Sequence, residues 1–124
     1  MILGHGVDVT EIARIEESLA RFGNRFIERT FCADEIAYCA AMAHPGPHYA
    51  ARFAAKEAVA KAFGLGIGGQ VGWRDVEVVR DAEGRPSICL HGNAQELATA
   101  RGVTRVHLAL SHAAGSAWAS VILE

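Results

Sequence analysis

The stretch ARFAAKEAVAKAFG, residues 51–64, predicts a long helix around which the rest of the chain packs. Its small apolar residues fall on one broad arc of a helical wheel that advances about 100° per residue, as a buried face requires. These residues are Ala55, Ala58, Val59 and Ala62. Four charged residues interrupt the stretch: Arg52, Lys56, Glu57 and Lys61. The simplest interpretation is that Glu57 and Lys61, as i,i+4 neighbours, form a surface ion pair worth about 0.3–0.5 kcal/mol.

The composition is typical of a globular protein of ordinary domain size. The chain has 124 residues, of which 51% are hydrophobic, and its formal net charge is −2. A nucleic-acid-binding protein usually carries a strong basic excess, and no apolar segment approaches the ~20 residues of a membrane span. The three cysteines, Cys32, Cys39 and Cys89, form no CxxC pair, and the N-terminal segment MILGHGVDV has neither a basic region nor a long apolar run. We therefore expect reduced thiols, a cytoplasmic location, and neither a nucleic-acid nor a membrane partner.

The flanking segments predict an α+β fold, with a mainly antiparallel sheet packed against the long helix and residues 1–124 forming a single domain. Strands are expected at 2–9, 75–79, 86–91, 107–112 and 116–123. Shorter helices are expected at 11–22, 25–29, 33–43 and 93–101, and the long helix at 48–63 after the HPGP break at 44–47. Thr10 is expected to cap helix 11–22 and Gly23 to end it.

A second carboxylate gives the charges on the long helix a chemical interpretation. Asp8 lies near the end of an apolar strand, where a polar residue serves no packing purpose. An Asp from a strand and a Glu from a helix can together hold Mg²⁺, which usually takes one or two protein carboxylates and fills its other positions with water and phosphate oxygens. Lys61 beside them can neutralise a phosphate. The pattern permits a phosphate-handling metal site, although periodicity alone does not require one.

Three stretches together resemble a known family. They are GHGVDVTEIARI at 4–15, RFAAKEAVAKAFG at 52–64 and LSHAAGSAWASVI at 110–122. Their order and spacing are similar to those of the holo-acyl-carrier-protein synthase type of 4′-phosphopantetheinyl transferase, and the resemblance covers nearly the whole chain. It implies a small cytosolic enzyme of fatty acid biosynthesis and lipid metabolism. Such an enzyme is a homotrimer with active sites between subunits, and it transfers phosphopantetheine from coenzyme A to a serine of an acyl carrier protein, leaving 3′,5′-ADP.

The resemblance also implies roles for individual residues. Asp8 and Glu57 correspond to the Mg²⁺ ligands, Glu57 and Lys61 to the catalytic residues, and Lys61 to a contact with the coenzyme A phosphates. Glu57 accepts the serine proton either directly or through a metal-bound water, and the sequence does not decide between these routes. The other residues expected at the coenzyme A site are Arg52, Gly64, Arg85, Pro86, Ser111 and His112. The chain departs from the family at Ser116, where an aromatic residue is common, and at Arg85, where lysine is common.

An arginine series predicts where the carrier protein docks. Arg14, Arg21 and Arg25 recur at spacings of seven and four, and Phe26 adds an apolar contact. Acyl carrier proteins are acidic, so basic residues beside the site would steer and hold one. Without the family resemblance, the simpler interpretation is a solvated face balanced by acidic neighbours: Glu16, Glu17 and Glu28.

Several other interpretations are weighed against this one. The Asp8–Glu57 pair also suits another magnesium-dependent phosphotransferase or a pyrophosphatase, and a non-enzymatic module of the same fold would bind coenzyme A or a carrier protein without turnover. A zinc site at Cys32, Cys39, His44 and His48 is disfavoured because its spacing matches no ordinary zinc motif. The glycine-rich segment GLGIGG at 64–69 closes a helix rather than opening one, so it is expected to be a terminating loop.

Overall fold

The computed structural model describes residues 1–124 and contains two antiparallel sheets. The strands are β1 (Gly4–Glu11), β2 (Val76–Arg80), β3 (Pro86–Leu90), β4 (Val106–Ala113) and β5 (Ser116–Leu123). The helices are α1 (Ile12–Phe22), α2 (Asn24–Thr30), α3 (Ala33–Ala40), α4 (Pro45–Ala62) and α5 (Gly92–Ala100), with a 3₁₀ helix η1 (Trp73–Asp75) before β2. The predicted α+β class is confirmed. The strands divide into a three-stranded sheet in the order β1-β5-β4 and the separate β2–β3 hairpin.

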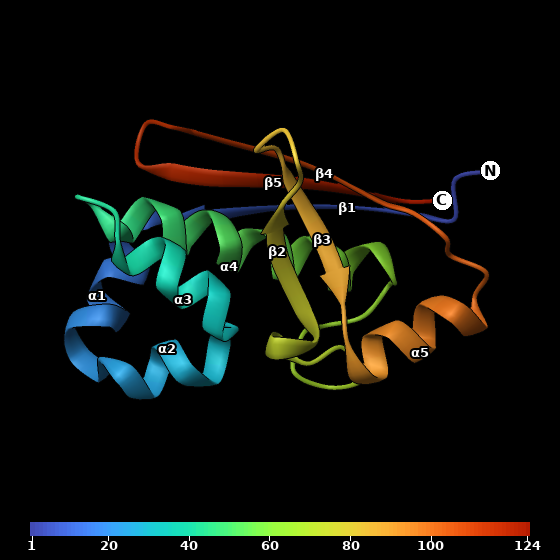
Figure 1. Ribbon diagram of the computed structural model, residues 1–124, viewed down its shortest axis with the longest axis horizontal. Coiled ribbons are helices and arrows are strands. Elements are labelled where there is room, and N and C mark those ends of the chain that lie inside the picture. Colours follow the sequence, from blue (N-terminus) through green and yellow to red (C-terminus); the bar gives the residue numbers. More distant parts are fainter.

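Helix α4 lies against one face of the three-stranded sheet, as Figure 1 shows. Helices α1, α2 and α3 gather at one end of the molecule, while the two termini lie close together at the other end. The β2–β3 hairpin and α5 pack on the remaining side of α4. Because α4 contributes residues to both hydrophobic clusters of the core, it joins the helical end to the sheet and the hairpin.

Strand β1 approaches α4 more closely than side chains would allow. A Cβ atom added to Gly6 would lie 2.1 Å from the carbonyl oxygen of Ala58, and one added to Gly4 would lie 2.1 Å from that of Ala62. Both contacts are with helix backbone, which has little freedom to move. The Gly-x-Gly pattern at the start of β1 and the alanines of α4 therefore act together, because glycine on one side and alanine on the other permit this separation.

Most expected elements are present, with shifts at their ends. Gly23 ends α1 with a positive φ of 55°, as predicted. Helix α4 begins three residues earlier than expected, because the proline at its N-terminus suits the first helical turn rather than preventing it. The prediction that Thr10 caps α1 is wrong. Thr10 is still part of β1, and its hydroxyl donates a 2.8 Å hydrogen bond to Oδ2 of Asp8.

Lys56, one of the four charged residues on α4, is fully buried. Its ammonium group lies 2.8 Å from Oε1 of Glu35, and both side chains have no exposed surface. Lys56 also donates to the carbonyl oxygens of Trp73 and Val76. Glu35 in turn accepts bonds from the backbone N–H groups of Cys32 and Val78, at 2.8 and 2.9 Å. This ion pair therefore connects α3, α4, η1 and β2, and its role is structural.

Gly6→Ala tests the close contact between β1 and α4. We expect it to lower the free energy of unfolding by about 3 kcal/mol, because a methyl group cannot fit against the helix backbone. Urea denaturation followed by circular dichroism measures the change. The matched control is Gly66→Ala, since a Cβ atom there meets nothing within 4 Å. Equal unfolding midpoints for the two variants would contradict the packing described here.

Lys56→Met tests the buried ion pair. We expect a loss of about 3–5 kcal/mol in the free energy of unfolding, because the carboxylate of Glu35 is left buried without its cation. Lys61→Met is the control. Its side chain is 51% exposed and its pair with Asp8 is partly solvated, so the change expected there is below about 1 kcal/mol. A loss for Lys56→Met no greater than that of the control would show that Lys56 does not stabilise the fold.

Candidate active site

The alternation of β1 turns Asp8 toward α4. Gly4, Gly6, Asp8 and Thr10 are the less exposed residues of the strand, and the residues between them face outward. Both carboxylate oxygens of Asp8 are held. The Thr10 hydroxyl donates to Oδ2, and the ammonium group of Lys61 lies 3.0 Å from Oδ1. Lys61 also donates to the carbonyl oxygen of Val7, at 3.2 Å. Lys61 therefore pairs with Asp8 across the β1–α4 contact.

Glu57 lies beside Asp8 and is half-buried. Burial raises the pKa of the Glu57 carboxyl group above its ordinary value of 4.5, and the negative charge of Asp8 raises it further. The positive charge of Lys61 acts in the opposite direction and only partly offsets these effects. Two carboxylates close enough to repel each other, with a single lysine beside them, form a site that favours an added cation.

Asp8 and Glu57 line one hollow of about 260 Å³, which we call the carboxylate hollow. Its wall is completed by residues of β1, α1, α2 and α4: Val9, Thr10, Arg14, Ile15, Ser18, Phe26 and Phe53. Its polar side chains present oxygen atoms, apart from the guanidinium group of Arg14. Oxygen ligands are those that Mg²⁺ prefers, and two carboxylates leave its remaining positions to water and phosphate oxygens. The residues present therefore fit the predicted magnesium ion.

A second hollow, of about 240 Å³, collects most of the residues expected to bind coenzyme A. Arg52, Pro86, Ser111 and His112 all line it, together with Tyr38 and Arg80, and we call it the arginine hollow. Arg52 is only 5% exposed, and its guanidinium carbon lies 4.3 Å from the centre of the Tyr38 ring. Its Nε is buried without a hydrogen-bond partner. A buried guanidinium with an unused donor is suited to an anionic ligand.

The remaining predicted residues lie around these two hollows. Arg85 is 72% exposed, pairs with Asp81 and Glu83, and borders a neighbouring hollow with Pro86. Gly64 is exposed just beyond α4, with a φ of 79°. Neither Gly64 nor Lys61 lines the carboxylate hollow or the arginine hollow.

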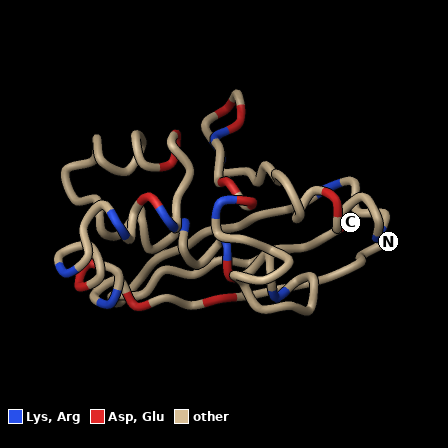
Figure 2. The backbone as a smooth tube through the Cα atoms, turned by 90° about the horizontal axis from the view of Figure 1, so that it is seen from below, with Lys and Arg blue, Asp and Glu red and all other residues tan.

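The residues expected to dock a carrier protein are divided. Arg14 borders the carboxylate hollow and shares a further hollow with Arg21, whereas Arg25 is exposed on α2. Phe26 is 8% exposed and packs edge-on against Phe31, so it belongs to the wall and core rather than to an open surface. Figure 2 shows basic and acidic segments mixed at this helical end.

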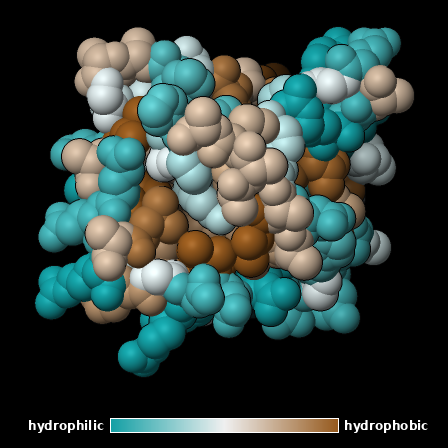
Figure 3. Space-filling model, turned by 60° about the vertical axis from the view of Figure 1, so that its left-hand side comes forward, coloured by the Kyte–Doolittle hydropathy of each residue, from teal (hydrophilic) through white to brown (hydrophobic).

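Two features of this region were not predicted. Thr10 holds Asp8, and the sequence signal was present in their separation of two residues, which places them on the same face of a strand. Phe22 is 50% exposed beside Arg21, whose guanidinium carbon lies 5.3 Å from the ring centre. Nothing in the local sequence distinguished Phe22 from an ordinary core residue of α1. Figure 3, with the helical end turned forward, shows hydrophobic atoms between hydrophilic side chains.

Comparisons with known proteins agree with this geometry. The family model of the 4′-phosphopantetheinyl transferase superfamily matches residues 4–116. The chain belongs to that superfamily. A holo-[acyl-carrier-protein] synthase of Koribacter versatilis is 49% identical over 124 residues, which cover 100% of this chain and 99% of the relative. The chain is therefore similar over its full length to a phosphopantetheinyl transferase. The predicted family, the holo-acyl-carrier-protein synthase type of 4′-phosphopantetheinyl transferase, is confirmed.

Solved structures of the superfamily share the fold. The crystal structure of holo-[acyl-carrier-protein] synthase from Neisseria meningitidis has a TM-score of 0.92 and 34% identity, and the match covers 100% of this chain and 99% of that one. The enzyme from Helicobacter pylori, solved in complex with coenzyme A, has a TM-score of 0.85 and 32% identity, with 97% of this chain and 99% of that one covered. In this chain, none of the helices combines the length and apolar composition needed to cross a bilayer.

Glu57→Gln tests the electrostatics of the Asp8–Glu57–Lys61 cluster. The raised pKa means that ionised Glu57 destabilises the folded state once the pH exceeds the ordinary value of 4.5, and this effect is absent below that value. In metal-free protein, we expect Glu57→Gln to raise the melting temperature at neutral pH and to have less effect as the pH falls through 4.5. Calorimetry from about pH 4 to about pH 8 in EDTA measures the difference from wild type. A variant less stable than wild type at neutral pH would contradict the assignment.

Proposed function

We propose that this chain transfers the 4′-phosphopantetheine group of coenzyme A to a serine of an apo acyl carrier protein in a Mg²⁺-dependent reaction. The products are holo carrier protein and 3′,5′-ADP. The observation that carries the proposal is the Asp8–Glu57–Lys61 cluster, in a chain similar over its full length to holo-[acyl-carrier-protein] synthases. Residues 1–124 would act as one transferase domain, which is supported by the participation of α4 in both core clusters.

Asp8 and Glu57 are the residues that would hold the magnesium ion. Once bound there, Mg²⁺ would act as a Lewis acid and offset the charge of the coenzyme A pyrophosphate. The Thr10 hydroxyl fixes the orientation of Asp8, so that the carboxylate does not have to be ordered when the substrate arrives. Lys61 is 51% exposed, which leaves its ammonium group free to turn from Asp8 to a phosphate oxygen.

Glu57 is the best-placed proton acceptor. The serine hydroxyl of the carrier protein attacks phosphorus, the P–O bond to 3′,5′-ADP breaks, and the hydroxyl proton must leave. In the metal-free protein, burial and the charge of Asp8 raise the pKa of Glu57, whereas a bound Mg²⁺ would oppose this rise. The role of Glu57 is therefore supported by its position beside Asp8 in the wall of the carboxylate hollow. The proton reaches Glu57 directly or through an intervening water, and this chain needs no nucleophile of its own.

The arginine hollow would bind a part of coenzyme A other than the pyrophosphate held at the magnesium site. A phosphate of the coenzyme suits the buried guanidinium group of Arg52. The unpartnered Nε of Arg52, with Ser111 and His112 in the same wall, supports this role. Pro86 lines this hollow, and Arg85, next to it on the β2–β3 hairpin, lines the neighbouring one. A guanidinium at position 85 suits phosphate as well as the more usual lysine does. Gly64 and Lys61, at the end of α4, would approach the pyrophosphate from the other side.

We also propose that the chain assembles into a homotrimer whose active sites lie between subunits. The carboxylate and arginine hollows share no lining residue. Within one subunit they therefore form two separate pockets, and a ligand that occupied both would not lie in a continuous pocket. The outer face of the three-stranded sheet supports assembly, because Val7, Val9 and Trp118 are each about half exposed there. In such an assembly, the arginine hollow of one subunit and the carboxylates of its neighbour would together form one active site.

The acidic carrier protein would dock on the helical end. Arg14 connects the carboxylate hollow to the further hollow that it shares with Arg21, and Arg25 adds an exposed guanidinium on α2. Exposed Phe22 offers the apolar contact that the sequence had assigned to Phe26. The free cysteines are those of a protein kept in a reducing compartment, and we propose that the enzyme works in the cytoplasm.

Intact-protein mass spectrometry of an apo acyl carrier protein, incubated with this chain, coenzyme A and Mg²⁺, tests the function. We expect a gain of one phosphopantetheine that disappears with EDTA. Asp8→Asn and Glu57→Gln should each lower the rate at least about 100-fold, whereas Glu96→Gln, at an exposed site on α5, should not.

The other outcomes separate the alternatives. Binding of coenzyme A without transfer to several carrier proteins would favour a non-catalytic module. Cleavage of coenzyme A without a carrier protein would favour a pyrophosphatase. Full activity in EDTA would overturn the metal site.

A further inference from the structure

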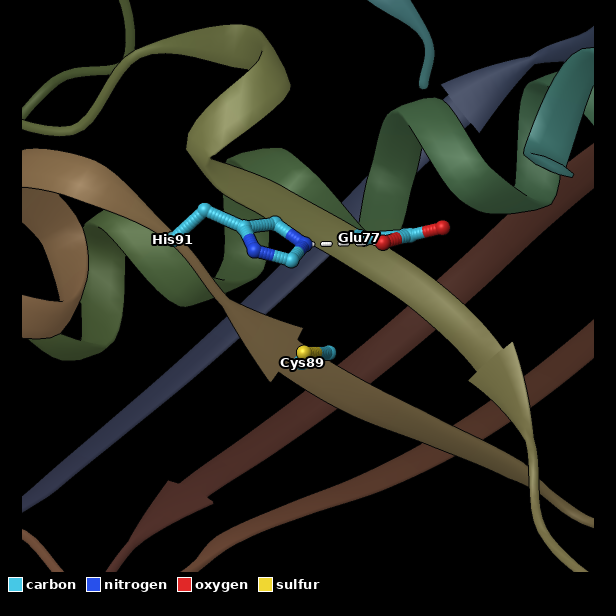
Figure 4. A group of neighbouring side chains, drawn as sticks. All are labelled: Glu77, Cys89 and His91. Carbon is cyan, nitrogen blue, oxygen red and sulfur yellow. Dashed lines mark hydrogen bonds and ion pairs between the residues drawn. The ribbon is translucent and has the colours of Figure 1, made fainter. Parts of the chain in front are cut away.

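The β2–β3 hairpin brings together three side chains of the types that ligate transition metals. Glu77, Cys89 and His91 each offer one ligand atom, and these atoms lie within 4.8 Å of one another. In Figure 4 the His91 ring points at the Glu77 carboxylate, and the Cys89 sulfur lies next to them on β3. None of the three lines the carboxylate hollow or the arginine hollow.

Strand pairing fixes this arrangement. Glu77 and Cys89 are direct partners in the β2–β3 register. His91 follows Cys89 by two residues and so emerges on the same face, because side chains alternate along an extended chain. The His91 backbone N–H donates to the carbonyl oxygen of Asp75 at 2.8 Å, which continues the ladder beyond the end of β3. The three side chains are therefore presented by hydrogen-bonded backbone and not by a loop.

A second histidine–glutamate contact in the chain provides a comparison for Glu77, Cys89 and His91, which we call the hairpin cluster. His107 and Glu124 lie 2.9 Å apart, much like His91 and Glu77 at 2.8 Å. The His107 pair has no cysteine beside it and belongs to no group of three ligands. The two glutamates also differ, because the Glu77 side chain is 12% exposed and that of Glu124 is 43% exposed. The cysteine thiol and the more buried carboxylate distinguish the hairpin cluster from an ordinary surface contact.

We propose that Glu77, Cys89 and His91 bind a divalent transition metal ion of the Zn²⁺ class. A thiolate, an imidazole nitrogen and a carboxylate oxygen are all ligands of such ions, and three protein ligands leave a fourth tetrahedral position for water. Magnesium prefers oxygen ligands and bound water, so the hairpin site and the carboxylate hollow select different metals. Binding requires Cys89 to lose its thiol proton to solvent, and His91 to bind through Nε2 as the neutral ring with its proton on Nδ1. Any proton between His91 and Glu77 is also released to solvent, and the ion takes its place.

The geometry requires only small adjustments. Tetrahedral zinc with bonds of about 2.0–2.3 Å places its ligand atoms roughly 3.3–3.7 Å apart. Because all the ligand atoms lie within 4.8 Å of one another, no separation must close by more than about 1.5 Å, and the contact between His91 and Glu77 must open slightly. Cys89 and His91 are both exposed, so their side chains are free to rotate, while the largely buried Glu77 serves as the fixed ligand.

A metal at this position would tie the two strands of the hairpin. Glu77 and Cys89 lie near the end of the hairpin that is remote from its turn, and Arg85 and Pro86 lie at the turn itself. The ion would add a link between β2 and β3 without occupying the surfaces assigned to magnesium, coenzyme A or the carrier protein.

Titration with Co²⁺, which reports its ligands through its absorption spectrum, tests the site. The full chain without an affinity tag is used, reduced and in excess Mg²⁺, so that all-oxygen sites are filled. We expect one Co²⁺ per chain, with tetrahedral visible bands and a sulfur-to-cobalt charge-transfer band that Zn²⁺ displaces. Cys89→Ser should abolish the charge-transfer band. His91→Gln and Glu77→Gln should each weaken binding at least about tenfold.

His107→Gln and Cys32→Ser are the matched controls. His107 makes the same kind of contact with a glutamate, and Cys32 is a thiol whose Sγ donates to the carbonyl oxygen of Arg74. Both variants should bind Co²⁺ as wild type does. The proposal is overturned if no charge-transfer band appears, if the band survives in Cys89→Ser, or if either control removes it. Because the readout is spectroscopic, it does not depend on transferase activity.

Discussion

The close contact between the backbones of β1 and α4 is the constraint on which the rest of the structure depends. Gly4 and Gly6 let the strand lie against the carbonyl oxygens of Ala58 and Ala62, at a distance that any side chain would prevent. Asp8 follows two residues later on the same face of the strand. Its carboxylate thereby reaches Lys61 and the neighbourhood of Glu57, so a packing requirement also determines the spacing of the charged groups.

The four charged residues of α4 illustrate how one helix serves several purposes. Lys56 is neutralised inside the protein by Glu35 and links four elements of the fold. Arg52 is also buried, but it stacks on Tyr38 and retains an unused donor. Glu57 and Lys61 lie near Asp8, away from the hollow that Arg52 lines. Because Lys56, Glu57 and Lys61 belong to one helix, the distance between the buried ion pair and the charged groups near Asp8 is fixed.

The sequence predicts most of the helices and strands, but only some of the contacts between them. Apolar periodicity located α4 and its buried alanines. The position of Asp8 at the end of an apolar strand suggested its pairing with Glu57, and the family resemblance gave the pair its role. Contacts between segments that are distant in the sequence were harder to predict. The i,i+4 spacing suggested that Lys61 pairs with Glu57, whereas its ion-pair partner is Asp8, across the contact between β1 and α4. The zinc hypothesis considered Cys32, Cys39, His44 and His48, but strand register instead groups Glu77, Cys89 and His91. Local patterns do not encode which strands become neighbours.

The glycines of β1 have a consequence for the fidelity of folding. A slip of one residue between β1 and β5 would turn His5 and Val7 toward α4, in place of Gly4 and Gly6. Neither side chain fits against the helix backbone, so a strand in the wrong register cannot dock. The narrow gap therefore destabilises misaligned sheets relative to the native one, and the native register presents Asp8 on the inner face.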